Sequence, residues 1–99
     1  ENVLTCGPLV IDITNHRVLR DGIPIDLTVR EYAILEYLIR NKNIVVTREQ
    51  IRANIWNIDD DINSNVVDVY IRYLRRKIDD PFPEKLIHTI RGIGYRLEC

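Results

Sequence analysis

The chain contains 99 residues, 45% of them hydrophobic and 29% charged, with a formal net charge of −1 at pH 7. This length and composition are typical of one soluble globular domain that can bury a core without disulfides or metals. No apolar run approaches the ~20 residues that span a bilayer, and no signal-peptide pattern opens the chain, so we expect a cytoplasmic protein without membrane contact.

The first 27 residues predict three or four short antiparallel strands. Alternating apolar residues in LVIDI (9–13) indicate a strand with one buried face. Thr14-Asn15 supplies a turn, and Asp21-Gly22 is the two-residue loop of a β-hairpin. Pro24 lacks an N–H group, which places the following strand at an edge or in an irregular position.

Two capping boxes predict the first two helices. Thr28 with Glu31 opens a helix over 28–41, and Thr47 with Gln50 opens one over 47–56, because each pair can satisfy N–H groups at a helix start. The core stripe of the first helix is Tyr32, Leu35, Leu38 and Ile39. A short extended piece is expected at 44–46, between the two helices.

The third predicted helix, 65–78, has an unusual outer face. Its core stripe is Val67, Ile71, Leu74 and Ile78, at helical spacing. Its opposite face carries Asn65, Val66, Val69, Arg72, Tyr73 and Arg76. Residues 1–63 carry 7 basic and 10 acidic side chains, whereas residues 64–96 carry 7 basic and 4 acidic ones. Arginines, an amide and small apolar groups suit a DNA major groove, and the alternative is a surface that binds protein.

The last segment, 86–97, is rich in β-forming residues and contains Gly92 and Gly94. A glycine pair of this kind also occurs in dinucleotide-binding loops, but those require a following helix, and this chain ends five residues after Gly94. We therefore interpret the glycines as the turn of a β-hairpin, where a missing Cβ permits positive φ and close backbone approach. The predicted fold class is α+β, a winged helix-turn-helix with the hairpin as its wing.

Four segments in this order resemble one known family: LTVREYAILEYLI, VTREQIRANIW, NVVDVYIRYLRRKID and IHTIRGIGYRLE. Together they are similar to the C-terminal effector domain of the OmpR/PhoB family of bacterial response regulators. The resemblance implies a single winged-helix domain over 1–99, with an N-terminal antiparallel four-stranded sheet, three helices and a C-terminal wing. It also implies a preceding receiver domain that a sensor kinase phosphorylates. The absence of an initiator methionine agrees with a segment of a longer protein.

The resemblance further implies binding to double-stranded promoter DNA, with tandem repeats as the expected sites and a monomeric domain off DNA. Helix 65–78 would enter the major groove, and Arg91 of the wing would reach the minor groove. The implied DNA-binding residues are Arg48, Trp56, Asn65, Val69, Tyr70, Arg72, Tyr73, Arg75, Arg76, Thr89, Arg91 and Tyr95. For Trp56 and Tyr70, packing in the core is the competing interpretation. Asn65, Tyr70 and Tyr73 differ from some family members, so no target sequence follows.

The resemblance also implies that the acidic segment 57–64 contacts RNA polymerase, through Ile58, Asp59, Asp60, Asp61 and Ile62. The same segment suggests a calcium loop, but in both possible registers the required glycine and the final glutamate are missing.

No catalytic motif is present, and we expect neither an enzyme, a cofactor nor a metal site. Cys6 and Cys99 form no metal-binding spacing and are expected to be free thiols. A winged-helix module that binds protein remains the alternative function.

Overall fold

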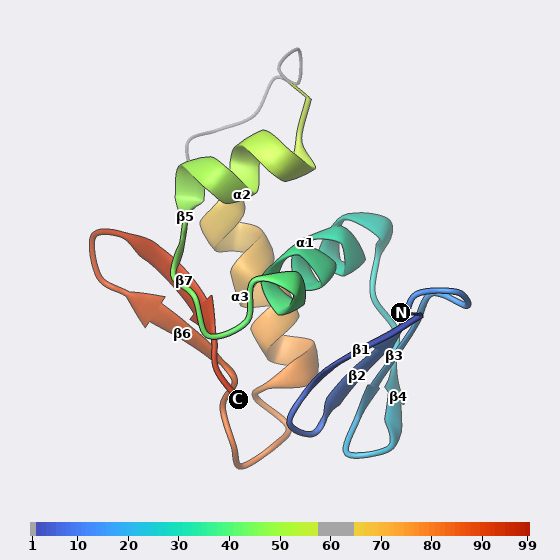
Figure 1. The fold of residues 1–99 in the computed structure, drawn as a ribbon. Helices are drawn as coiled ribbons and strands as arrows, with labels where there is room; N and C mark the ends of the chain where they lie inside the picture. The colour runs from blue at the N-terminus through green and yellow to red at the C-terminus, as the bar shows by residue number, and fades with distance from the viewer. Residues whose placement is uncertain (1, 58–64) are drawn as a thin grey trace.

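The structure, a computed structural model, describes residues 2–57 and 65–99. The elements follow in the order β1 (Val3–Cys6), β2 (Leu9–Asp12), β3 (Arg17–Arg20), β4 (Ile23–Ile25), α1 (Val29–Arg40), β5 (Val46–Thr47), α2 (Arg48–Ile55), α3 (Val66–Ile78), β6 (Ile87–Ile90) and β7 (Gly94–Leu97). The predicted succession of sheet, helices and terminal hairpin is confirmed (Figure 1).

The N-terminal strands form one antiparallel sheet in the order β1-β2-β3-β4. The predicted hairpin turn between β3 and β4 is confirmed, because Asp21 and Gly22 both have positive φ, 54° and 78°. Two consecutive positive φ angles match the right-handed twist of the flanking strands. Pro24 lies in β4, the edge strand, where its missing N–H group interrupts no ladder in the sheet interior.

Both capping boxes are present. The Thr28 hydroxyl accepts from the Glu31 backbone N–H while the Glu31 carboxylate accepts from Thr28, and Thr47 with Gln50 makes the same exchange. The core stripes predicted for α1 and α3 are also confirmed. Each of their eight residues is at most 8% exposed, namely Tyr32, Leu35, Leu38, Ile39, Val67, Ile71, Leu74 and Ile78.

The wing, which we define as residues 87–97, belongs to a second sheet with the strand order β5-β7-β6. The short extended piece predicted at 44–46 begins two residues later and ends one residue later in the structure, since the strand is Val46–Thr47 and pairs with Tyr95 and Gly94. A Cβ on Gly94 would lie 2.0 Å from the Val46 carbonyl oxygen, and Gly92 has a φ of +74°. The predicted roles of the two glycines, close approach and turn, are therefore both observed.

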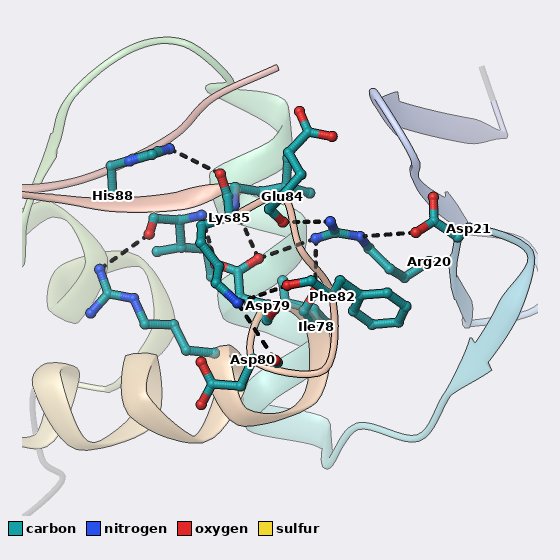
Figure 2. A network of polar contacts seen from close by, with 12 residues as sticks. Arg20, Asp21, Ile78, Asp79, Asp80, Phe82, Glu84, Lys85 and His88 are labelled. Atoms are coloured by element: carbon teal, nitrogen blue, oxygen red, sulfur yellow. Dashed lines mark hydrogen bonds and ion pairs between the residues drawn. The ribbon is translucent and has the colours of Figure 1, made fainter.

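A buried ion pair joins the N-terminal sheet to the C-terminal end of α3 (Figure 2). Arg20 and Asp79 are 1% and 2% exposed, and Arg20 Nη1 donates to Asp79 Oδ1 at 3.2 Å and to the Ile78 carbonyl at 2.8 Å. The backbone N–H groups of Leu86 and Ile87 both donate to the Asp79 carboxylate at 3.0 Å. One buried carboxylate thus fixes the helix end, the sheet and the start of the wing.

The expectation of free thiols is wrong, because Cys6 and Cys99 form a disulfide. Cys6 ends the edge strand β1, and Cys99 follows β7, with 5.3 Å between their Cα atoms. The C-terminus is held at this place because Cys99 N donates to Asn43 Oδ1 and Glu98 N donates to the Leu86 carbonyl. A pairing across 93 positions has no local sequence signal.

Candidate nucleic-acid interface

The outer face of α3 presents basic side chains to solvent. Arg72, Tyr73 and Arg76 are exposed, while Val66 and Val69 are half-buried beside them. Over residues 2–57 and 65–99, Arg72 and Arg76 form no hydrogen bond or ion pair. The charge of Arg72 helps to lower the pKa of Asp68, but both guanidinium groups remain exposed and available for hydrogen bonds to an anionic partner.

The start of α3 leaves the Asn65 side chain unused for capping. Asn65 has φ −99° and ψ 12°, and its amide makes no side-chain cap hydrogen bond. An asparagine at the N-cap position usually accepts from the N–H groups of the first turn. Asn65 is exposed, so its amide is available for an external hydrogen bond.

The wing is tied to α3 by Arg75. Arg75 Nη2 donates to Thr89 Oγ1 at 2.6 Å and to the Ile87 carbonyl at 3.2 Å. Its guanidinium carbon also lies 5.6 Å from the centroid of the Tyr95 ring. Of the residues predicted to bind DNA, the structure therefore brings together one from the helix and two from the wing.

Asp68 occupies the centre of a second polar cluster. Arg48 Nε donates to Asp68 Oδ1 at 2.7 Å, and the Tyr95 hydroxyl donates to the same oxygen. Arg48 lies 5.3 Å from the Tyr95 ring centroid, a distance at which a guanidinium is attracted to an aromatic face. The cluster connects the first residue of α2, the first turn of α3 and the wing strand β7.

The charges in this cluster shift two ionisation equilibria in opposite directions. Burial alone raises the pKa of Asp68, but hydrogen bonds from Tyr95 and Arg48 outweigh it and hold that pKa below its usual value. Burial, with the hydrogen bond to Asp68, raises the pKa of Tyr95. Asp68 is therefore an anion and Tyr95 a neutral donor at neutral pH.

The tip of the wing carries Arg91 next to Gly92. Arg91 is exposed, and Ile93 on the other side of the turn is 51% exposed. Within the described ranges, Arg91 has no hydrogen bond or ion pair. The tip of the β6–β7 hairpin, which projects away from the helices in Figure 1, therefore presents a cation and an apolar side chain to solvent.

Three aromatic residues of the predicted set lie largely inside the domain. Trp56 is 8% and Tyr95 4% exposed, and Tyr70 packs partly buried against the core. The rings of Trp56 and Tyr70 meet edge to face with centroids 5.5 Å apart. Packing is thus the observed role of Trp56 and Tyr70, whereas Tyr95 both packs and donates to Asp68. DNA contact by any of the three stays a prediction.

Asp68 is the functional candidate that the sequence interpretation did not single out. It is the sole acidic residue in the helix VVDVYIRYLRRKI, which is the available signal. Its position in the first turn offered an ordinary explanation, since acids favour helix N-termini.

The predicted polymerase-contact residues 58–62 lie outside the described residues. Within the described part of the chain, no group of three or more histidine, cysteine, aspartate or glutamate side chains is arranged to hold a metal ion. None of the helices in that part has the length and apolarity needed to cross a membrane.

Comparisons with known proteins identify a family. The family model for "Transcriptional regulatory protein, C terminal" matches residues 22–97. The response regulator ArlR of Staphylococcus saprophyticus is 44% identical over 96% of this chain and 43% of its own length. The transcriptional regulatory protein TcrA of Mycobacterium tuberculosis is 49% identical over 95% of this chain and 37% of its own length. The chain therefore spans less than half of these relatives.

Solved structures of similar fold point to the same family. The response regulator DrrB of Thermotoga maritima, an OmpR/PhoB homolog, superposes with a TM-score of 0.87 at 36% identity, covering 100% of this chain and 45% of that one. The RstA DNA-binding domain of Klebsiella pneumoniae, solved in complex with the RstA box, has a TM-score of 0.86 at 27% identity. It covers 99% of this chain and 98% of that one.

Proposed function

Because this chain belongs to the OmpR/PhoB family of transcriptional regulatory protein C-terminal domains, we propose that it binds double-stranded DNA sequence-specifically and regulates transcription. One observation carries the proposal. Arg72, Arg76 and Arg91 are exposed on α3 and on the adjoining wing, and no described carboxylate pairs with them. The DNA complex of the similar RstA domain supports the same assignment. The family is one of regulators and not of enzymes.

Each part of the surface has a proposed role. Helix α3 enters the major groove, where the Arg72 guanidinium can pair with guanine and Val69 can contact a thymine methyl group. Arg91 enters the adjacent minor groove, whose negative potential attracts arginine. Phosphate contacts from Arg48 and Arg76 set the register of the protein on the duplex. Base contacts then determine which sequence is bound.

The salt dependence of binding tests this function against the alternative of a protein-binding module. Fluorescence anisotropy with a random-sequence duplex should give a log K that falls linearly with log[salt], by about 0.9 for each phosphate neutralised. A surface that binds protein has no reason to bind duplex in this way. Absence of binding at low salt, or a flat response, would exclude the DNA-binding function.

Replacing Arg72 with alanine should weaken binding to a selected site by about 1–3 kcal/mol if its guanidinium reads a base. Affinity for random duplex should fall less, so the ratio between the two decreases. The matched control is Arg17→Ala, which removes another exposed arginine, from β3 in the N-terminal sheet. Equal losses on both duplexes would assign Arg72 to a phosphate instead.

Further proposals concern the longer protein to which this domain belongs. We propose a cytoplasmic response regulator in which a sensor kinase acts on a receiver domain and two copies bind tandem repeats, because the relatives are more than twice as long as this chain. The acidic residues Asp60 and Asp61 would contact RNA polymerase. Reversing both charges should lower activated transcription in a reconstituted assay while DNA affinity is nearly unchanged; unaltered transcription would remove this role.

A further inference from the structure

Asp68 is an anion within a surface that we propose binds an anion. Its side chain is 36% exposed, and the Arg48 side chain that it holds is 37% exposed. By itself, the Asp68 carboxylate disfavours the approach of DNA, because it repels phosphate groups. A reason for a carboxylate at this place therefore has to come from the contacts that it makes.

Those contacts join the two kinds of DNA contact. Arg48, the proposed phosphate-binding residue, begins α2, whereas Asp68 lies one helical turn before Arg72, the proposed base-reading residue. Asp68 Oδ1 accepts from Arg48 Nε at 2.7 Å and from the Tyr95 hydroxyl. Arg48 uses Nε for the hydrogen bond to Asp68 and also interacts with Tyr95, but its side chain remains 37% exposed, so a phosphate group can still reach it.

We propose that Asp68 is a positioning residue that determines specificity: its carboxylate fixes Arg48 relative to α3, so that the phosphate contact and the base-reading side chains engage the duplex in one register. This inference rests on the proposed DNA-binding function. Phosphate contacts set register without reading sequence, so a phosphate-binding arginine that is free to move accepts several registers. Fixing it favours the register in which the bases match.

The proposal predicts opposite effects on two kinds of DNA. Without the carboxylate, Arg48 still attracts phosphates and the repulsion is gone, so affinity for random duplex stays equal or rises. Affinity for the correct site falls, because the fixed register is lost. The ratio of the affinity for selected duplex to the affinity for random duplex should therefore fall on the order of tenfold in Asp68→Asn.

The experiment measures anisotropy with two duplexes of equal length, one selected by the wild-type chain from a random pool and one of random sequence. Asp26→Asn is the matched control, because it removes one carboxylate from the connection between β4 and α1, where Asp26 is exposed and forms no hydrogen bond or ion pair with any described residue. Tyr95→Phe removes one donor to Asp68. It should also lower the ratio of affinities for selected and random duplex, but by less than Asp68→Asn does. In an Arg48→Gln background, Asp68→Asn should produce no further narrowing.

Several results would overturn the inference. Equal losses on both duplexes, with a lowered melting temperature, would mean that Asp68 only supports the fold. If Asp68→Asn and Asp26→Asn have the same ratio of affinities for selected and random duplex, Asp68 has no role in binding. Loss of preference for a single cytosine, with the other positions intact, would mean that the carboxylate reads a base directly. If the wild-type chain binds neither duplex, the proposed function itself fails.

Discussion

Asp79→Ala is expected to destabilise the domain by about 3–5 kcal/mol, because it removes the buried counter-charge of Arg20 and leaves only the half-exposed Asp21, 3.9 Å from Arg20 Nε. Asp79 is 2% exposed and accepts from Arg20 and from two backbone N–H groups of the segment entering the wing. Removing it leaves all three donors without this acceptor in a buried site. Urea unfolding followed by circular dichroism measures the loss as a lower midpoint at an unchanged slope.

The adjacent Asp80 supplies the control. Its side chain is exposed, so Asp80→Ala should change the free energy of unfolding by no more than about 0.5 kcal/mol. The double variant Arg20→Met/Asp79→Leu should be more stable than either single variant, since it removes both charges and fills the space with apolar atoms. Similar losses for Asp79→Ala and Asp80→Ala would show that the buried pair contributes little.

Opening the Cys6–Cys99 disulfide is the second change with a large expected effect. The bond closes a loop across 93 positions of sequence, nearly the whole domain. Loop-closure entropy in the unfolded chain then predicts a loss of about 4–5 kcal/mol when the bond is reduced. Thermal unfolding with and without dithiothreitol should show a large decrease in melting temperature. The variant Cys6→Ser/Cys99→Ser should already melt at that lower temperature.

The serine variant also serves as the control for the reductant, which should have no effect on it. Free-thiol titration of the unfolded, unreduced wild type should find no reactive thiols. Two reactive thiols together with an unchanged melting temperature would show that the bond does not form in solution. The proposed cytoplasmic location gives this measurement added weight, because that compartment keeps most thiols reduced.

Local sequence patterns predicted the elements that local forces determine. The capping boxes at Thr28 and Thr47, the positive-φ turn at Asp21-Gly22 and the apolar stripe of α3 each follow from interactions within a few residues. All were confirmed, and their order along the chain was enough to predict a winged helix-turn-helix.

The contacts that sequence reasoning missed join distant segments. Arg20 and Asp79 are 59 positions apart, and Arg48 and Asp68 are 20 apart. Each of these residues is also an ordinary surface type, and no periodicity distinguishes a paired charge from a solvated one. The sequence also left two interpretations of Trp56 open, because an indole N–H group suits both a residue in the core and one that contacts a phosphate.

The pairing of β5 with β7 has a consequence for the DNA. Thr47, which caps α2, is paired with Gly94 of the wing, so the helix-turn-helix and the wing tip belong to one hydrogen-bonded body. We expect such a preorganised body to lose little conformational entropy on binding. The protein then fixes the distance between its major-groove and minor-groove contacts, so the duplex has to bend or change its groove width to fit. Sites with flexible base steps or a narrow minor groove between the contacts should therefore be preferred, even at base pairs that no side chain touches.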